Sequence, residues 1–404
     1  MYMGDMMINY NNIVSFKKSS IIFIEDNYPK KSFYIITSGK AVSYGKYFDS
    51  NMEYTKGDIL GLVNSALNEP YFFNVKADTD IEALEINIDD IIKIYNKELI
   101  KKMHNYLENS LEVWLSKYYI NLSHHHSMTK YDINEGYVLN MAQVYNDNNL
   151  PTAAYQIYNQ YLKLFPNSSS IKDIKDMIDS MKEYSLPEPE AMEDNVFFYK
   201  KGYCLYTELI AGNYLYIINS GKVGVYNVVN SKLVTRAIYS SNNLIDGYMP
   251  DINYQPLSTT TVVLEDSKIK LLKKEEFISI VANVNSLRPY YLKIICTKIR
   301  NSVLKVMALN SQDIFMKLLI TIYYIVRTET LFTGKEINTA DLLYKLHDIA
   351  AVIGYNDIGV IKSELKKIHY ITIDDDYIHV IDINNFIKEY ETYKKRLSIK
   401  SHHK

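Results

Sequence analysis

The chain has 404 residues, of which 47% are hydrophobic and 23% are charged, and its formal net charge is −2. This length gives room for about three domains, and the composition is typical of a folded globular protein rather than a disordered one. Two cysteines exclude a disulfide framework and a four-cysteine zinc or iron–sulfur site, so we expect a cytoplasmic protein. The longest apolar run, residues 318–326, is about half as long as a membrane-spanning helix, and the N-terminus has no signal-peptide pattern.

A repeat marks the first predicted elements. Residues 33–40 read FYIITSGK and residues 215–222 read LYIINSGK. Two near-identical octapeptides so far apart indicate that a whole domain is duplicated. In each copy, aromatic and β-branched residues run into Ser-Gly and then into further strand-forming residues, which predicts a strand, a tight turn and a strand. Gly39 and Gly221 are expected to supply the positive φ of the turn.

Both copies resemble the central hairpin of the cyclic-nucleotide-binding β-roll, as in the catabolite activator protein and the regulatory subunits of cyclic-AMP-dependent kinase. Residues 56–61 (KGDILG) are similar to the segment that leads into the family's phosphate-binding cassette. Residues 262–277 are similar to the last strands and the closing helix of the roll. The resemblance covers about residues 13–96 and 196–282, and it implies two jelly-roll-like β-rolls within an α+β chain.

The resemblance also implies a ligand site. In this family a glutamate after the cassette glycine binds the ribose, and an arginine after a proline binds the cyclic phosphate. Here Leu62 follows Gly61 and Tyr71 follows Pro70, so the first roll lacks both charged groups. Because a buried phosphate without a charged partner is costly, we expect that cyclic AMP and cyclic GMP do not bind in the usual way.

The second roll departs from the pattern as well. Ile245 stands in place of the cassette glycine, and Leu257 follows Pro256. Asp246 is the candidate that replaces the glutamate, as a contact for a different and less charged ligand. Two purely structural rolls are the alternative, and no cofactor is expected.

Between the rolls, residues 126–190 are expected to be largely helical. Tyr145, Ala154, Tyr158 and Pro166 lie where a tetratricopeptide unit has an aromatic, a small residue, an aromatic and a helix-ending proline. One such unit cannot bury its own face. A plain helical hairpin that serves as a spacer is therefore the alternative.

Past the second roll, a long helix is expected from about Arg288. Its apolar residues recur every three or four positions, which is the spacing of a packing seam. In the catabolite-activator family the corresponding helix pairs two subunits, which implies a homodimer. Packing of the same stripe on the helix's own roll is the alternative. The predicted seam consists of Leu292, Ile295, Ile299 and Val303.

The last hundred residues resemble the winged helix-turn-helix of the same family. Residues 348–354 (DIAAVIG) match the family pattern, in which an alanine permits close helix crossing and a glycine makes the turn. Asn356 or Asp357 is expected to cap the second helix, whose buried face would hold Ile361, Leu365 and Ile368. Residues 370–380 alternate around an acidic turn, which predicts the wing.

The second helix of this motif carries the candidate DNA contacts. The arginine–glutamate pair and the second arginine of the family are replaced by Ile358, Gly359 and Ser363. Exposed lysines more often bind phosphate than specify sequence. Residues 286–404 hold 18 basic and 13 acidic side chains, which mildly favours nucleic acid. The predicted contacts are Asn356, Lys362, Ser363, Lys366 and Lys367.

We therefore predict a bacterial transcription regulator of the catabolite-activator type, a homodimer that binds double-stranded DNA and responds to an unidentified effector. A non-DNA-binding scaffold or signalling adaptor built from the same domains is the alternative. No catalytic motif, membrane contact or metal site is expected, because His124–His126 have no cysteine or acidic cluster beside them. The predicted domains are the first roll (1–125), the helical spacer and linker (126–190), the second roll (191–285), the connecting helix (286–310) and the winged helix-turn-helix domain (311–404).

Overall fold

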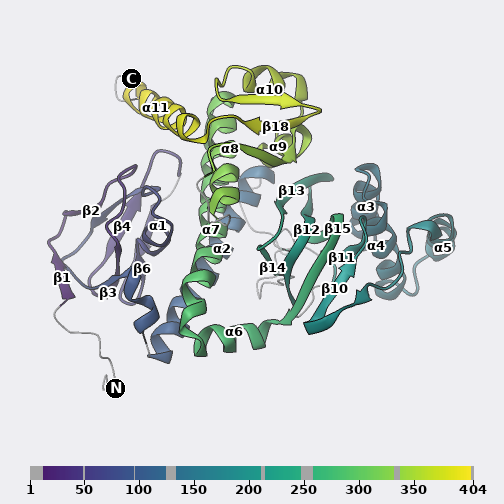
Figure 1. Cartoon of the computed structure of the whole chain (residues 1–404), viewed down its shortest axis with the longest axis horizontal. Helices are drawn as coiled ribbons and strands as arrows, with labels where there is room; N and C mark the ends of the chain where they lie inside the picture. Colours follow the sequence, from purple (N-terminus) through teal and green to yellow (C-terminus); the bar gives the residue numbers. More distant parts are fainter. Residues whose placement is uncertain are drawn as a thin grey trace. The chain divides into compact units, whose positions relative to one another are not determined.

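The computed structural model describes residues 12–48, 51–94, 96–123, 133–210, 214–246, 258–331 and 337–401, apart from the side chains of residues 246, 278, 282 and 397–401. The chain divides into two compact units (Figure 1). The first unit combines residues 1–115 with residues 278–311, and the second combines residues 116–277 with residues 312–404. Both units are therefore discontinuous in sequence.

The first unit contains two four-stranded antiparallel sheets, with the strand orders β1-β8-β3-β6 and β2-β7-β4-β5. Tyr34 and Val75, which belong to different sheets, share one buried apolar cluster, so the two sheets face each other. This arrangement is a β-roll, here called the first roll. Its strands are β1 (Ile13–Phe16), β2 (Ile21–Phe23), β3 (Ser32–Ser38), β4 (Ala41–Tyr44), β5 (Met52–Tyr54), β6 (Ile59–Leu60), β7 (Asn74–Ala77) and β8 (Ile81–Asn87).

The first Ser-Gly-Lys segment is a corner between the two sheets, and the predicted hairpin is wrong. β3 pairs with β6 and β8, whereas β4 pairs with β5 and β7, so β3 and β4 do not pair with each other. Gly39 has the predicted positive φ of +87°. A Cβ at this position would lie 2.1 Å from the backbone oxygen of Asp80, so the corner requires glycine.

Helices complete the first unit. They include α1 (Leu62–Leu67), the first part of α2 (Lys97–Ser123) and α7 (Arg288–Asn310), with 3-10 turns η2 (Ile88–Lys93) and η6 (Asn285–Leu287). α7 packs against α1. At its start, the guanidinium of Arg288 donates to the backbone oxygens of Ile94 and Val281. A helix that is distant in sequence is thus part of the first unit.

The second unit contains a seven-stranded antiparallel sheet, here called the second sheet. Its main path is β13-β12-β15-β10-β9, while β11 pairs with β15 and β14 pairs with β12. The strands are β9 (Glu190–Ala191), β10 (Val196–Tyr199), β11 (Cys204–Tyr206), β12 (Tyr214–Val229), β13 (Lys232–Tyr239), β14 (Leu244–Asp246) and β15 (Thr260–Lys273); η3 (Lys182–Tyr184), η4 (Glu193–Asn195) and α6 (Lys274–Asn283) flank them.

The second Ser-Gly-Lys segment lies inside one continuous strand, so a tight turn is wrong here too. β12 runs through Gly221, and its register against β15 shifts on both sides of this residue. Gly221 has a φ of +96°, as predicted. Ile218 and Val223, before and after the irregularity, belong to the same buried cluster. The strand bends at the glycine and does not reverse.

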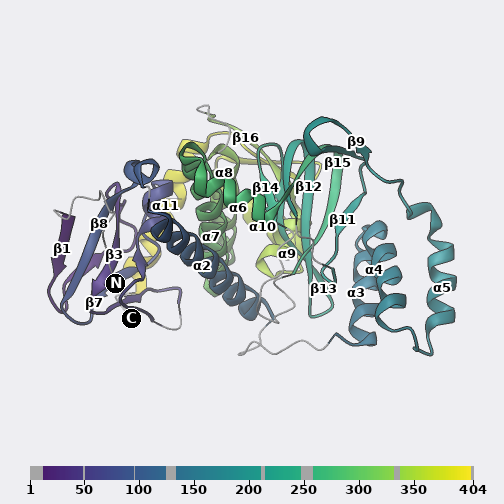
Figure 2. The same ribbon diagram turned by 90° about the horizontal axis from the view of Figure 1, so that it is seen from below.

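The predicted helical segment packs on the second sheet (Figure 2). It forms α3 (Glu135–Asp147), α4 (Pro151–Leu164) and α5 (Ile171–Ser180). Tyr145, Ala154 and Tyr158 are buried in a cluster that also holds Tyr226 and Val262 of the sheet. A single helical pair has too little apolar surface to be stable alone, and the sheet supplies the partner that further repeats would supply in a solenoid.

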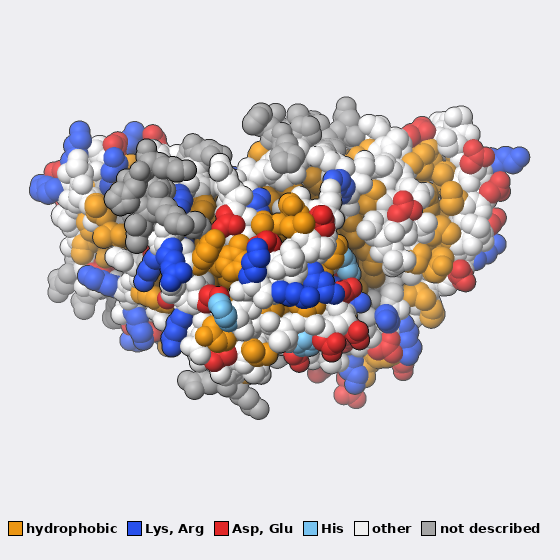
Figure 3. Space-filling view, turned by 90° about the horizontal axis from the view of Figure 1, so that it is seen from above, with side chains coloured by type: hydrophobic (Ala, Val, Ile, Leu, Met, Phe, Trp, Pro, Cys, Tyr) orange, Lys and Arg blue, Asp and Glu red, His pale blue; other side chains and the backbone are white. Residues whose placement is uncertain are grey.

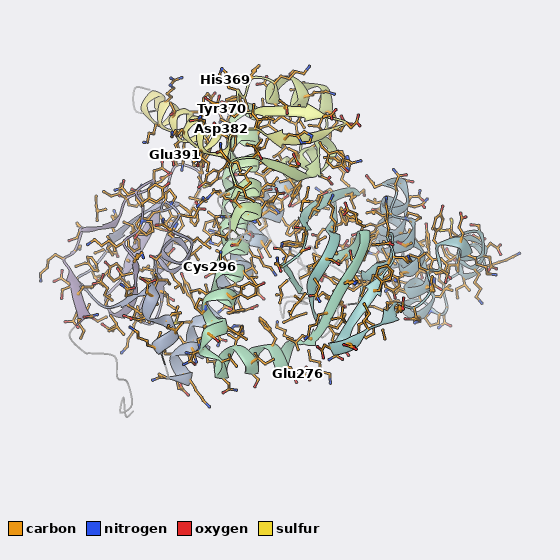
Figure 4. All side chains as sticks on the ribbon, viewed as in Figure 1. Glu276, Cys296, His369, Tyr370, Asp382 and Glu391 are labelled. Carbon is orange, nitrogen blue, oxygen red and sulfur yellow. The ribbon has the colours of Figure 1, made fainter. Side chains whose placement is uncertain are left out.

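The C-terminal module extends from α8 to α11. Its elements are α8 (Ile314–Leu331), β16 (Ala340–Lys345), α9 (Leu346–Ile353), α10 (Ile358–Leu365), β17 (Ile371–Asp374), β18 (Tyr377–Val380) and α11 (Ile383–Ser401). The three strands form a sheet in the order β16-β18-β17. α9 ends at Ile353 and is capped by Gly354, whose φ is +65°. His369 and Tyr370 connect α10 to β17, and Asp382 follows β18 (Figure 4).

The C-terminal module docks on the second sheet through α9 and β16. The Thr235 hydroxyl of β13 donates to the Asp348 carboxylate of α9 at 2.9 Å. The backbone N–H of Ile238 donates to the Tyr344 hydroxyl at 3.0 Å. In the part of the chain that the structure describes, no helix is long and apolar enough to cross a membrane.

Candidate functional site

The first unit contains a cavity of about 430 Å³. One wall is the segment from Gly57 to Leu62, which runs through β6 into α1. A second wall is α2, and Ile299 and Val303 of α7 contribute a third. A cavity of this size falls in the range of small-molecule sites. The predicted ligand segment of the first roll therefore does border this cavity.

Aromatic and aliphatic groups occupy the two positions where the family has charged ones. Leu62 begins α1 and is 1% exposed. Tyr71 stacks on Phe23, with ring centroids 4.1 Å apart and planes 18° apart. Burial raises the pKa of Tyr71 well above its usual value, so this phenol stays neutral. Gly61, with a φ of +78°, lets the backbone pass the Phe23 ring. The first roll thus presents no charge at these two positions.

A buried ion pair lies beside the cavity and joins α7 to the loop that carries Tyr71. The guanidinium Nη1 of Arg300 lies 3.1 Å from the Oε1 of Glu69, and the two side chains are 0% and 2% exposed. Asn301 accepts two further hydrogen bonds from the same guanidinium, at 2.9 and 3.1 Å. Glu69 immediately precedes Pro70 and Tyr71. Sequence reasoning missed this pair, although an arginine beside Ile299 in an apolar stripe was a usable signal.

The predicted dimer seam is already buried within a single chain. Leu292, Ile295, Ile299 and Val303 are between 1% and 6% exposed. Cys296, halfway along α7 (Figure 4), is fully buried. Because little of these side chains is left to bury in a dimer, the structure favours the alternative of packing on a roll. The roll in contact is the first one, whereas the sequence suggested the second. The homodimer itself stays a prediction.

The second candidate ligand contact is only partly described. Asp246 ends β14, where its backbone pairs with Leu215 of β12. Its side chain lies outside the described residues, as do Pro256 and Leu257. Ile245, in the place of the cassette glycine, is 2% exposed and belongs to the core of the second sheet. The role of Asp246 as a ligand contact stays a prediction.

α10 and the turn that follows it present the predicted basic surface. The Asp357 carboxylate accepts the backbone N–H of Val360 at 3.0 Å, so Asp357, and not Asn356, caps the helix. The three residues predicted for the buried face, Ile361, Leu365 and Ile368, are at most 1% exposed. The predicted contacts on the opposite face are all exposed: Asn356, Lys362, Ser363, Lys366 and Lys367.

Acidic groups surround this basic surface. Lys367 pairs with Glu364 at 2.5 Å, and Lys362 lies 3.8 Å from Asp376 in the turn of the β17–β18 hairpin. Asp374 and Asp375 add two more carboxylates to the same turn. Both basic and acidic side chains are present on the face shown in Figure 3. The attraction of this surface for phosphate is therefore offset locally.

Metal ligation was not expected. Among the described residues, no group of three or more His, Cys, Asp or Glu side chains is arranged to hold a metal ion. His124–His126 lie outside the described residues.

Comparison with known proteins identifies one part of the chain. Residues 13–98 match the family model of the cyclic nucleotide-binding domain. The first roll is therefore similar to a cyclic nucleotide-binding domain. No curated protein matches the chain in sequence.

Several solved structures resemble about half of the chain. A CooA mutant from Carboxydothermus hydrogenoformans has 18% identity over 48% of this chain and 87% of that chain, with a TM-score of 0.38. FixK2 from Bradyrhizobium japonicum has 13% identity over 48% of this chain and 95% of that chain, with a TM-score of 0.38. A CRP-family transcriptional regulator from Thermus thermophilus has 12% identity over 48% of this chain and 96% of that chain, with a TM-score of 0.33.

Proposed function

We propose that the chain is a transcription regulator of the catabolite-activator type that contacts double-stranded DNA through α10. The observation that carries the proposal is the exposed row of Lys362 on α10 and of Lys366 and Lys367 directly after it, opposite a face that is fully buried. A short helix that follows a helix and a tight turn, and precedes a β-hairpin, is the geometry with which winged helix-turn-helix proteins enter the major groove. The cyclic nucleotide-binding domain at the N-terminus supports a regulatory role.

The lysines are suited to hold DNA rather than to read it. Lysine neutralises phosphates at the rim of the groove, whereas bidentate arginine reads guanine. Ser363 is the candidate for base contact, although its hydroxyl donates to the backbone oxygen of Val360 in the free protein, at 2.8 Å. We therefore expect affinity with limited sequence preference. A homodimer with two reading helices would raise both the affinity for DNA and the sequence preference. Sedimentation of the parent protein tests whether it is a dimer.

A scaffold or signalling adaptor is the competing function, and the acidic hairpin turn favours it. Asp374, Asp375 and Asp376 would face the phosphates if the hairpin contacted DNA as a wing. Docking on a basic protein segment would suit the same turn. The two functions differ in whether α10 binds duplex DNA.

Salt-dependent binding to random duplex DNA separates the two functions. Replacement of Lys362, Lys366 and Lys367 by Ala should weaken binding about equally for all sequences, and it should reduce the log–log salt slope by about one unit for each phosphate contact removed. Ser363→Ala should change sequence preference more than affinity. The matched control replaces Lys172, Lys175 and Lys182 by Ala, which removes the same charge from the exposed surface around α5.

The control variant should bind as the parent does. If the α10 variant also binds as well as the parent, α10 is not the reading helix. If the parent itself does not bind at low salt, the adaptor function replaces the regulator.

A further inference from the structure

The cavity of the first roll is lined largely by rings. Phe73 and Trp114 stack with centroids 6.3 Å apart and planes 18° apart, and Phe23 stacks on Tyr71. Flat walls of this kind favour a flat ligand, because ring faces make large apolar contact areas with other rings. The aromatic side chains of the lining are Phe23, Tyr54, Tyr71, Phe72, Phe73, Tyr106 and Trp114.

The charged groups that line the cavity are either hydrogen-bonded within the protein or exposed to solvent. The Asp58 carboxylate accepts hydrogen bonds from the backbone N–H and the hydroxyl of Thr55, at 2.6 and 3.3 Å. Lys102 is the one cation among the described residues of the lining, and it is exposed, as is Glu53. Burial raises the pKa of Tyr54 to about 12, so its phenol stays neutral. The Arg300 guanidinium beside the cavity is occupied by Glu69. An anion in the cavity would therefore find no buried cation that is not already paired.

α2 supplies polar groups that suit a neutral ligand. Asn105 and Asn109 lie one turn apart on α2, and both border the cavity. Their side-chain amides make no hydrogen bond to another described residue. Each amide offers one acceptor and two donors and carries no charge. Ser110 is less available, because its hydroxyl donates to the backbone oxygen of Tyr106 at 2.7 Å.

We propose that this cavity binds an uncharged, ring-containing small molecule, with its rings against the aromatic lining and its polar atoms on Asn105 and Asn109. The proposal goes beyond DNA binding and does not depend on it. The usual ligands of this domain family are cyclic nucleotides, and the ligand proposed here differs from them by lacking the phosphate charge.

A ligand in this cavity would contact α7, the helix that leads into the C-terminal module. Ile299 and Val303 of α7 contribute to the lining, and Arg300 between them holds the loop of Tyr71. α7 ends at Asn310, and α8, the first element of the C-terminal module, begins at Ile314. A ligand that contacts α7 differently in two arrangements would shift their populations. α7 is thus the element that responds to occupancy.

The test uses the full chain and its single tryptophan, Trp114, which borders the cavity. Adenosine and benzimidazole serve as neutral ring probes, and cyclic AMP serves as the charged counterpart of adenosine. We expect a saturable change of Trp114 emission with each neutral probe at concentrations up to about 5 mM, and at least about tenfold weaker binding of cyclic AMP than of adenosine. Hydrogen exchange of residues 295–305 should slow when adenosine is bound.

Two variants locate the binding. Asn109→Phe places a ring in the cavity at an exposed helix position and should abolish the response to both neutral probes. Lys101→Phe makes the same change at an exposed position of α2 outside the lining and should respond as the parent does. Circular dichroism confirms that both variants are folded.

Three results would overturn the proposal. Neither neutral probe changes the emission, or cyclic AMP binds as tightly as adenosine, or Asn109→Phe binds as well as the parent while folded. Binding of adenosine without slower exchange in residues 295–305 would remove the role of α7. None of these measurements depends on DNA, so a failure here is distinct from a failure of the regulator function.

Discussion

The first roll and the second sheet share a corner but differ in what they pack against. In the first roll, the Asp80 carboxylate accepts the backbone N–H of Lys18 at 2.8 Å and pairs with Lys17 at 3.0 Å. In the second sheet, Asp266 makes the same two contacts with Lys201 and Lys200, at 2.8 and 3.2 Å. The hydrogen bonds and the opposite charges lower the pKa of both aspartates. The corner is thus repeated in detail.

Around this corner, the surroundings diverge. Glu25 of the first roll follows Lys17 at the same distance in sequence as Glu208 of the second sheet follows Lys200. Glu25 is half-buried, whereas Glu208 is 1% exposed and accepts the Tyr145 hydroxyl of α3 at 2.5 Å. The chain's own helices cover the second sheet, while the first roll encloses a cavity with α2 and α7. The two segments therefore share these local contacts, and they differ in the elements that pack around them.

The largest expected effect is a loss of stability in the first unit when its buried ion pair is broken. Arg300→Ala or Glu69→Ala leaves one buried charge without its partner in the first unit, which should destabilise that unit by about 3–5 kcal/mol. The double variant Arg300→Met with Glu69→Gln should recover most of the loss, because no net charge stays buried. Urea unfolding followed by Trp114 emission measures the first unit. Equal stability of the single variants and the parent would show that the pair is not buried in solution.

The left-handed conformation of Gly39 and Gly221 predicts that alanine destabilises the protein at both positions. Gly39→Ala should destabilise by about 2–4 kcal/mol, because its Cβ would meet a backbone oxygen at 2.1 Å in a left-handed conformation. Gly221→Ala should cost less, because its Cβ would meet the side-chain oxygen of Ser267 at 2.1 Å, whereas its nearest backbone contact is 2.7 Å. Gly136→Ala, in the first turn of α3, is the control and should stabilise slightly. Thermal unfolding ranks the three variants, and a tolerated Gly39→Ala would contradict the corner geometry.

Glu208 gives the second unit a pH dependence. Burial raises the pKa of Glu208 to about 8, above the value of about 4.3 in an unfolded chain. The folded state therefore holds a proton that the unfolded state has lost, so stability should fall as pH rises from about 4.5 to 8, by up to about 1.4 kcal/mol per pH unit, and level off above. Glu208→Gln should remove this slope. Melting temperatures of parent and variant between pH 5 and 9 measure it, and parallel curves would show that Glu208 does not titrate in this range.

For cyclic nucleotides we expect no effect on the stability of the protein. Cyclic AMP and cyclic GMP at millimolar concentration should leave the melting temperature unchanged, because Leu62 and Tyr71 replace the charged groups that bind ribose and phosphate. Specific binding at about 100 times Kd would add about 2.7 kcal/mol of stability, which calorimetry detects easily. A saturable shift with micromolar cyclic AMP would show that another cation, such as Lys102, replaces the missing arginine.

The sequence was enough to predict features that depend only on residues close together along the chain. The positive φ of Gly39 and Gly221 and the buried face of α10 are of this kind, since each follows from local sterics or from helical period. Strand partners were not predictable, because β3 and β4 satisfy the same local pattern whether they pair with each other or with different sheets. The apolar stripe of α7 is a second example, because its spacing predicts that these side chains are buried but does not identify the element that they pack against. Arg300 and Glu69, 231 residues apart, meet only in the folded chain.

The discontinuity of the first unit has a consequence for synthesis. A ribosome releases residues 1–115 long before it makes α7, and the whole of the second sheet is translated in between. During this interval Glu69 lacks its arginine, and the cavity lacks the wall that Ile299 and Val303 supply. Domains usually fold from the N-terminus as they emerge. Here the N-terminal unit can be completed only after its neighbour has been made, so a ribosome that stalls between residues 120 and 280 exposes an unfinished roll to chaperones and proteases.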